Sequence, residues 1–230
     1  MPKVLISDKL DPLAVEIFEK NGVEVDFKPG LSPEEQLEII DQYDGLAIRS
    51  STTVTKEMIA KATKLKVVGR AGIGVDNVDI PAATEAGIVV MNTPFGNSVT
   101  TAEHAISMMM SLAREIPQAN ESTHAGKWEK KRFMGTELFN KTCGVIGCGN
   151  IGSIAADRAV GLRMKVVAYD PFLTEERADE LGVEKVELDE LFARADFITI
   201  HVPKNKHTAG LINKENIAKM KDGVRIVNCA

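Results

Sequence analysis

The sequence predicts an α/β protein with two doubly wound domains, each built on a parallel sheet. Short apolar runs alternate with capped, helix-like segments along almost the whole chain, and parallel neighbouring strands require such crossover segments. The length of 230 residues is large for one compact domain and suits two. A segment rich in turn-forming residues at 92–97 interrupts the alternation. We therefore expect a first domain at 1–93 and a second at 94–230.

Five apolar runs predict the strands of the first domain, at 4–6, 23–27, 46–48, 66–69 and 88–91. Helix start signals lie between them: Asp11 and Ser32 each precede a first-turn proline, and Glu35 can complete a capping box with Ser32. Further helices are expected to begin at Thr55 and Asp79 and to end at Gly22 and Gly87. This order of elements predicts a flavodoxin-like sheet with helices on both faces.

The second domain is expected to begin with a long helix, because Thr100 and Glu103 have capping-box spacing and apolar residues follow at helical intervals. Pro117 interrupts that pattern, and a second helical piece continues to about Gly126. The basic run 127–133 then surrounds the only tryptophan. Its simplest interpretation is a solvated loop. The alternative is an arm that reaches a neighbouring subunit or supplies charge to an anionic substrate.

The segment 141–152 has the most specific functional pattern in the chain. An apolar strand at 143–146 leads into Gly147, Gly149 and Gly152, which have G-x-G-x-x-G spacing, and a helical pattern follows. In such a turn the first glycine permits the sharp bend, the second admits the phosphates, and the third lets the helix pack on its strand. Amide groups at the start of the helix face the anion. This pattern predicts dinucleotide binding by a Rossmann domain.

The next predicted strand ends in Asp170, about 20 residues after the glycines, where dinucleotide-binding folds place an acid. Its carboxylate can accept hydrogen bonds from ribose hydroxyls and would repel a 2′-phosphate, so NAD is favoured over NADP. The alternation continues with helices at 174–181, 189–194 and 213–220 and strands at 185–187, 196–201 and 223–228. Because a complete dinucleotide domain has further elements, we expect the Rossmann domain to be incomplete at its C-terminal end and the sequence to be part of a longer chain.

Composition excludes several classes of function. The formal net charge of -5 argues against a nucleic acid or an anionic membrane as the main partner. No apolar run approaches the roughly 20 residues that a membrane helix needs, and no secretory signal pattern is present, so we expect a cytoplasmic protein. The three cysteines lack C-x-x-C spacing and no histidine pattern accompanies them, so neither a disulfide framework nor a metal site is expected.

The sequence resembles the D-2-hydroxyacid dehydrogenase family over its whole length. Beyond the glycine motif, the resemblance rests on the segments 67–79, 92–98, 127–129, 133–138 and 227–230. It implies that the first domain binds substrate, that the second binds NAD, and that the reaction takes place in the cleft between them. The implied reaction is oxidation of 3-phosphoglycerate at its C2 hydroxyl to 3-phosphohydroxypyruvate, which opens serine biosynthesis. A homodimer joined through residues 96–138 is also implied.

The first domain holds the candidate anchors for such an anionic substrate. Arg49 follows the third strand, where open α/β sheets bind ligands, and its guanidinium can hold a phosphate by two hydrogen bonds. Arg70 adjoins a loop in which Gly72 and Gly74 allow backbone amides to converge on an anion. For each arginine the alternative is a surface ion pair. The candidate substrate-binding residues are Arg49, Arg70, Gly72, Gly74, Val75 and, for the carboxylate, Asn97.

The resemblance also assigns the cofactor and catalytic positions. The candidate NAD-binding residues are Gly147, Gly149, Asn150, Ile151, Gly152, Asp170, Val202, Cys229 and Ala230, with Ile73 near the nicotinamide. The family's catalytic arginine directly follows the Asn-Cys-Ala run, which ends here at Ala230, and its glutamate and histidine come later. His201 ends a predicted strand, but the family places no acid–base residue there. No catalytic residue is therefore assigned, and we expect the 230-residue polypeptide to be inactive.

Two alternatives remain open. One is a dehydrogenase for another 2-hydroxyacid such as glycerate or lactate, although Arg49 and the basic run favour a phosphorylated substrate. The other is a non-catalytic, NAD-binding module that resembles the corepressors of this fold.

Overall fold

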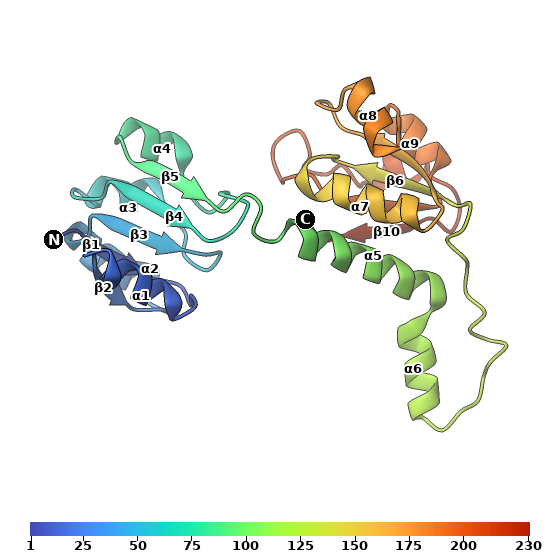
Figure 1. The fold of residues 1–230 in the computed structure, drawn as a ribbon, viewed down its shortest axis with the longest axis horizontal. Coiled ribbons are helices and arrows are strands. Elements are labelled where there is room, and N and C mark those ends of the chain that lie inside the picture. The colour runs from blue at the N-terminus through green and yellow to red at the C-terminus, as the bar shows by residue number, and fades with distance from the viewer. The chain divides into compact units, whose positions relative to one another are not determined.

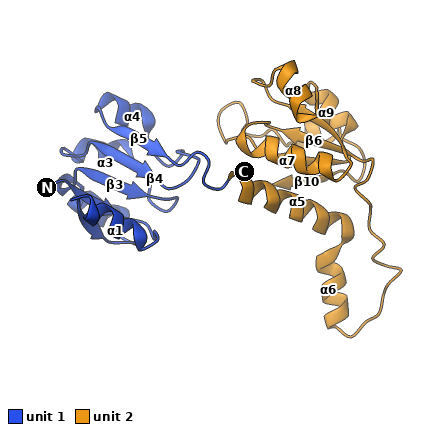
Figure 2. Ribbon diagram, in the orientation of Figure 1, with its two compact units in different colours: residues 1–97 blue, residues 98–230 orange.

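The computed structural model describes residues 1–230, which divide into two compact units, Met1–Asn97 and Ser98–Ala230 (Figure 2). Each unit contains one five-stranded sheet in which all strands run parallel. The predicted α/β class with two parallel sheets is confirmed. The boundary between the units falls at the end of the turn-rich segment 92–97.

Unit 1 has the strand order β2-β1-β3-β4-β5, which is the flavodoxin-like order (Figure 1). Its strands are β1 (Lys3–Ile6), β2 (Glu24–Phe27), β3 (Gly45–Ile48), β4 (Val67–Arg70) and β5 (Val89–Asn92). Its helices are α1 (Leu13–Lys20), α2 (Pro33–Ile39), α3 (Lys56–Lys61) and α4 (Ile80–Glu85), with a 3₁₀ turn η1 (Ile40–Gln42). The strand order reverses between β1 and β3, so their carboxyl ends form the expected ligand-binding edge.

Local capping chemistry explains most helix starts of unit 1. Ser32 and Glu35 form the predicted capping box, with the Glu35 amide 3.2 Å from the Ser32 hydroxyl and the Ser32 amide 2.8 Å from the Glu35 carboxylate. The predicted caps at Thr55 and Asp79 are also confirmed. Helix α1 is assigned from Leu13, but Pro12 before it already has helical dihedral angles. The Asp11 carboxylate accepts the amide of Leu13 over 2.9 Å and so caps this first turn, with the proline in the first helical position as predicted.

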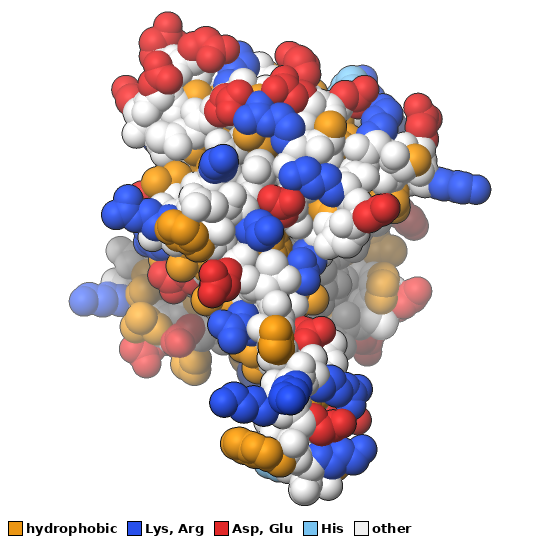
Figure 3. Space-filling model, turned by 90° about the vertical axis from the view of Figure 1, so that its right-hand side faces the viewer, with side chains coloured by type: hydrophobic (Ala, Val, Ile, Leu, Met, Phe, Trp, Pro, Cys, Tyr) orange, Lys and Arg blue, Asp and Glu red, His pale blue; other side chains and the backbone are white.

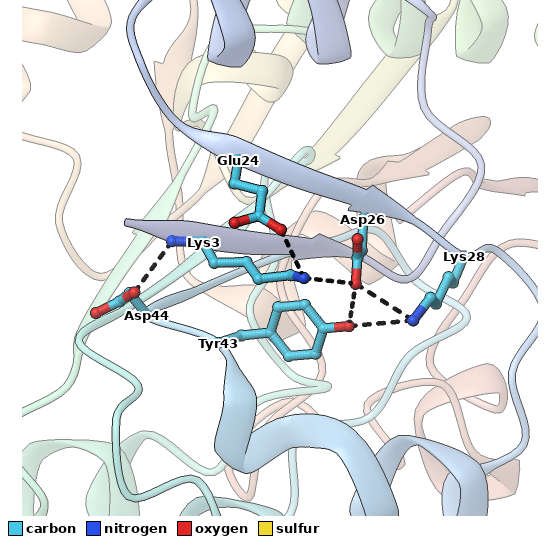
Figure 4. Close-up of polar contacts among 6 residues, drawn as sticks. All are labelled: Lys3, Glu24, Asp26, Lys28, Tyr43 and Asp44. Carbon is cyan, nitrogen blue, oxygen red and sulfur yellow. Dashed lines mark hydrogen bonds and ion pairs between the residues drawn. The ribbon is translucent and has the colours of Figure 1, made fainter. Parts of the chain in front are cut away.

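A polar cluster ties the edge strand β2 of unit 1 to its neighbour (Figure 4). The buried Tyr43 hydroxyl donates to Asp26 over 2.6 Å, and the ammonium groups of Lys3 and Lys28 lie 3.3 and 3.2 Å from the same carboxylate. The hydrogen bond from Tyr43 and the two lysines hold the pKa of Asp26 below its usual value. All these donors serve one carboxylate, so we interpret the cluster as structural.

Unit 2 has the strand order β10-β9-β6-β7-β8, which matches the first five strands of a Rossmann sheet. Its strands are β6 (Thr142–Ile146), β7 (Lys165–Tyr169), β8 (Glu184–Lys185), β9 (Phe197–Ile200) and β10 (Arg225–Asn228). Its helices are α5 (Ser98–Arg114), α6 (Ile116–His124), α7 (Asn150–Gly161), α8 (Glu175–Leu181), α9 (Leu188–Arg194) and α10 (Lys214–Ile217). Helices α5, α7 and α8 supply the core on one face of the sheet, and α9 supplies it on the other.

The helices α5 and α6 depart in part from the predicted pattern. The capping box predicted at Thr100 is wrong, because α5 already begins at Ser98 and includes Thr100. Glu115 takes a left-handed conformation with φ of 52° and separates the two helices, and Pro117 lies in the first turn of α6. Helix α6 and the segment after it extend away from the sheet of unit 2 (Figure 1). Helix α10 is also shorter than predicted and ends at Ile217.

In both sheets, an aspartate at the amino end of a central strand accepts a backbone amide from the neighbouring strand. Asp44, just before β3, accepts the amide of Lys3 over 3.0 Å, and Asp196, just before β9, accepts the amide of Thr142 over 2.8 Å. Each carboxylate also pairs with a lysine. These contacts fasten β1 to β3 and β6 to β9, the strand pairs at which each sheet reverses its order.

Candidate functional site

The glycine-rich turn of unit 2 is fixed by close contacts that exclude larger residues. Gly147 has φ of 86°, and a Cβ atom there would lie 2.6 Å from Cγ1 of Val202. A Cβ atom on Gly152 would lie 1.8 Å from the carbonyl oxygen of Gly147. The sharp turn and the tight packing of α7 on β6 therefore depend on these two glycines, which are the first and third of the motif.

Gly149, the second glycine, borders open space. A Cβ atom on it would meet nothing within 4 Å. Gly149 is also the N-cap residue of α7, and no side-chain hydrogen bond caps this helix. The amides of Asn150 and Ile151 consequently have no capping partner at the start of a 12-residue helix. Uncapped amides and the positive end of the helix dipole favour an anion here. A pyrophosphate fits this cradle.

Asp170 connects the turn to the end of β7. One carboxylate oxygen accepts the amide of Cys148 and the other accepts the amide of Phe172, both over 2.8 Å. Each oxygen keeps a lone pair for a ribose hydroxyl, because a carboxylate accepts about four hydrogen bonds. Burial, and then the charge of Asp170, raise the pKa of the Cys148 thiol to about 11, so the thiol is neutral in this site.

The carboxyl ends of β9 and β10 border a cavity of about 350 Å³. Val202 and Ala230 line it, and Cys229 between β10 and Ala230 is half-buried. His201 lies at the end of β9 with its Nε2 atom 2.9 Å from the Thr199 hydroxyl. Burial lowers the pKa of His201 to about 4, so its imidazole is neutral near pH 7.

The structure thus brings most of the candidate cofactor residues to one edge of the second sheet. At the ends of β6 and β7 and the start of α7 lie Gly147, Gly149, Asn150, Ile151, Gly152 and Asp170. At the ends of β9 and β10 lie Val202, Cys229 and Ala230. Ile73 belongs to unit 1.

The candidate substrate residues of unit 1 follow neighbouring strands. Arg49 is exposed directly after β3, and Arg70 is the half-buried last residue of β4. A Cβ atom on Gly72 would lie 2.0 Å from Nη1 of Arg70, so the guanidinium packs against this glycine. The Nε atom of Arg70 is buried without a hydrogen-bond partner. The two arginines therefore lie at the carboxyl edge of the sheet, with Arg49 open to solvent.

The loop after β4 offers free amides, although not at every predicted position. The amide of Gly72 donates to the Arg70 carbonyl over 2.9 Å and is not available to a ligand. The amides of Ile73, Gly74 and Val75 make no hydrogen bond within the chain and can serve an anion. The candidate Asn97 is exposed at the last position of unit 1.

Sequence reasoning missed two residues that hold the Arg49 loop. Asp8 is a buried carboxylate after β1 that accepts the amides of Arg49 and Thr52. Asn77, from the loop after β4, donates to the carbonyls of the same two residues. An acid just beyond a strand at the carboxyl edge is the signal that could have identified Asp8, since Asp170 stands in the same relation to β7.

The surface of unit 2 carries both signs of charge (Figure 3). Positive side chains gather at the lower end of this view, where α6 and the basic run 127–133 lie. Trp128, in that run, is 87% exposed.

No group of three or more His, Cys, Asp or Glu side chains is placed to hold a metal ion. None of the helices combines the length and apolar character required to cross a membrane.

A glycine-rich turn on a Rossmann sheet, an acid at the end of the next strand and an uncapped helix start together define a dinucleotide-binding protein. Residues 106–230 match the model of the D-isomer specific 2-hydroxyacid dehydrogenases, NAD binding domain. The chain belongs to this family, and NAD is its cofactor.

Individual relatives make the comparison more specific. The chain is 53% identical, over 230 residues, to D-3-phosphoglycerate dehydrogenase from Synechocystis sp., and the match covers 100% of the chain and 41% of that protein. The chain thus spans less than half the length of this relative. A glyoxylate reductase structure from Paecilomyes thermophila is 30% identical with a TM-score of 0.90, covering 99% of the chain and 73% of that protein. D-lactate dehydrogenase from Aquifex aeolicus, in complex with NAD and lactic acid, is 26% identical with a TM-score of 0.88, covering 98% of the chain and 68% of that protein.

Proposed function

We propose that the protein to which this chain belongs oxidises 3-phosphoglycerate to 3-phosphohydroxypyruvate with NAD, the first step of serine biosynthesis. The observation that carries the proposal is the 53% identity to a D-3-phosphoglycerate dehydrogenase over all 230 residues. The cationic and amide-rich edge of unit 1 supports a substrate with two anionic groups. The cytoplasmic location expected from the sequence stays a prediction.

Each unit then has a separate task. In unit 2, the first amides of α7 hold the pyrophosphate, and Asp170 accepts the adenosine ribose hydroxyls. When bound, NAD supplies the nicotinamide that accepts a hydride from C2. In unit 1, Arg49 binds the phosphate, and Arg70 with the amides of residues 73–75 binds and orients the rest of the substrate. We assign Asn97 as a donor to the substrate carboxylate.

The proton at the C2 hydroxyl needs a base that residues 1–230 do not supply. His201 is neutral, but it lies in unit 2 among the cofactor positions, and its Nε2 is engaged by Thr199. By resemblance, the arginine, glutamate and histidine that perform this step in the family match no position in residues 1–230. Losing proton transfer costs roughly 100- to 10,000-fold in rate, so we propose that the 230-residue polypeptide binds its ligands without turnover.

Calorimetric titration of the 230-residue chain tests the binding part of the proposal. We expect NAD to bind more tightly than NADP, and 3-phosphoglycerate more tightly than D-glycerate or D-lactate. Replacing Arg49 by Ala should weaken the binding of 3-phosphoglycerate about 10- to 100-fold, because a charge-assisted hydrogen bond is lost. Lys61→Ala, which removes an exposed charge at the end of α3, is the matched control and should change little.

The same titrations distinguish the alternatives. Equal or tighter binding of D-lactate or D-glycerate would indicate a dehydrogenase for another 2-hydroxyacid, a class to which the two structural neighbours belong by name or ligand. Binding of NAD without any of these acids would favour the non-catalytic module. An assay of the 230-residue chain for NAD-dependent turnover of 3-phosphoglycerate tests the catalytic part, and measurable turnover would refute it.

A further inference from the structure

We propose that Asp8 and Asn77 form a clamp that positions Arg49 for the substrate anion. This inference rests on the proposed function, because it concerns the same site. The clamp acts on the loop 49–52, which connects β3 to the rest of unit 1 and carries Arg49 at its first position. Neither residue needs to touch the ligand, so both are positioning residues.

Asp8 holds the N–H groups of the loop. Its Oδ2 atom accepts the amide of Arg49 over 2.5 Å and the amide of Thr52 over 3.2 Å, and its Oδ1 atom accepts the Thr52 hydroxyl over 2.9 Å. The Ser7 hydroxyl lies 2.9 Å from the same Thr52 hydroxyl. Asp8, Ser7 and Thr52 are all at most 5% exposed. The contacts are therefore shielded from competing water.

Asn77 holds the carbonyl groups of the same two residues. Its side-chain amide nitrogen donates to the Arg49 carbonyl over 2.7 Å and to the Thr52 carbonyl over 2.6 Å. Backbone contacts of Val54 with Asn77 and Asp79 continue this link between the two loops. The peptide groups at both ends of the loop are thus held on the donor side by Asp8 and on the acceptor side by Asn77.

The burial of the Asp8 side chain and its hydrogen bonds to the loop make the clamp rigid. No lysine or arginine pairs with this buried carboxylate, so the loop itself supplies its compensating hydrogen bonds. If the loop moved away, a buried carboxylate would lose its partners, which is strongly unfavourable. Arg49 therefore keeps its backbone position before any ligand arrives, and only its side chain must adjust.

Asn77 also links the two candidate anchors of the substrate. It lies in the loop that follows Arg70 at the end of β4 and contains the free amides of residues 73–75. Its contacts with the Arg49 loop fix the spacing between the backbone of Arg49 and these amides. A phosphate bound by Arg49 and an anion bound at the amides are then held at a defined separation, which distinguishes a phosphorylated acid from free phosphate.

The test compares variants that keep or break the clamp. In Asp8→Asn, the amide oxygen can accept both loop amides, and its NH₂ group can donate to Thr52, whose hydroxyl then donates to Ser7. Asp8→Ala removes all these contacts, and Asn77→Ala removes the opposite side. Thr52→Val and Thr52→Ser form a second pair, which removes or keeps one hydroxyl. Asp41→Ala, an exposed acid in η1, is the control.

Titration with 3-phosphoglycerate and with inorganic phosphate gives the first readout. We expect Asp8→Ala and Asn77→Ala to weaken the binding of 3-phosphoglycerate about 10- to 100-fold, because a displacement of Arg49 by about 1 Å has an effect of this size. Asp8→Asn should stay within about 3-fold of the wild type, as rescue by the conservative variant requires. NAD binding, a property of unit 2, should not change in any variant, and the protected amides of β3 in the second readout report that unit 1 is folded.

Amide hydrogen exchange of the ligand-free chain gives the second readout. Arg49 and Thr52 amides should exchange faster in Asp8→Ala than in the wild type and Asp8→Asn, while the amides of β3 stay protected. Unchanged 3-phosphoglycerate affinity in Asp8→Ala, or equal losses in Asp8→Asn and Asp8→Ala, would overturn the clamp and leave the proposed function intact. A wild-type chain that binds no phosphorylated acid would instead refute the substrate assignment, and the positioning role with it.

Discussion

Replacing Gly152 by alanine should separate the packing role of the glycine motif from its binding role. A Cβ atom at this position would lie 1.8 Å from the Gly147 carbonyl oxygen, whereas carbon and oxygen in close contact lie about 3.3 Å apart. Helix α7 or the turn must therefore move by about 1.5 Å. The obstacle is backbone and cannot rotate away, so the substitution should cost about 3 kcal/mol, the upper part of the range for overpacking.

Two other glycines of the same unit are matched controls. Gly161, in the last turn of α7, has no neighbour within 4 Å of its Cβ position, so Gly161→Ala should stabilise the helix by about 0.5–1 kcal/mol. Gly149 also has open space there, but that space is the proposed phosphate cradle. Gly149→Ala should therefore cost less than about 1 kcal/mol of stability, as an N-cap change does, and should weaken NAD.

Urea unfolding and NAD titration on the same samples measure both effects. Gly152→Ala should lower the unfolding free energy and the NAD affinity together, Gly149→Ala should lower mainly the affinity, and Gly161→Ala should lower neither. A Gly152→Ala variant as stable as the wild type would show that the close approach to Gly147 does not fix the turn. Unchanged NAD affinity in Gly149→Ala would remove the pyrophosphate from this cradle.

Four further predictions concern separate parts of the chain. Ser32→Ala should lower the stability of unit 1 by about 1 kcal/mol in urea unfolding, because it removes the capping box. Asp170→Ala should weaken the binding of NAD by about 10-fold or more and reduce the ratio of NAD affinity to NADP affinity in titrations. The reason is that the hydrogen-bond acceptor for the ribose and the contact to the glycine-rich turn are lost together. Burial lowers the pKa of His201 to about 4, so below about pH 6.5 the unfolded chain binds more protons than the folded chain. The free energy of unfolding should therefore fall by up to about 3 kcal/mol between pH 6.5 and pH 4. His201→Gln should flatten this dependence of the unfolding free energy on pH. If residues 96–138 form a dimer interface, Met108→Glu, at a methionine that is 44% exposed on α5, should shift the sedimentation coefficient from dimer to monomer.

Local patterns predicted the elements of this fold well, because the interactions that determine them are local. The capping box at Ser32 needs only residues three apart, and the strand–glycine–helix pattern at 143–152 contains its own geometry. The start of α5 was missed for a non-local reason. Ser98 and Ala102 are both buried, so tertiary packing extends the helix past the capping pattern at Thr100.

Which loop Asp8 and Asn77 hold was beyond sequence reasoning for the same reason. Asp8 contacts Thr52, which is 44 positions away, and Asn77 contacts Arg49, which is 28 positions away. These separations are created by sheet order, since β1 and β3 become neighbours only after the chain has passed through β2 at the edge. A motif search identifies the loop that binds a ligand, but it does not identify the side chain, distant in the sequence, that holds this loop in place.

The two sheets solve one physical problem in the same way. A loop that binds an anion must leave its own amides or cationic side chains unpaired, so it cannot be stabilised by its own hydrogen bonds. In unit 1, Asp8 after β1 accepts the amides of the loop after the neighbouring β3, and in unit 2, Asp170 after β7 accepts the amide of Cys148 in the turn after the neighbouring β6. Each carboxylate fixes part of the loop backbone and leaves Arg49 in one case and the α7 amides in the other free for a ligand. If this reasoning holds, Asp170→Asn should retain the turn, as Asp8→Asn retains the clamp, and should weaken NAD less than Asp170→Ala does.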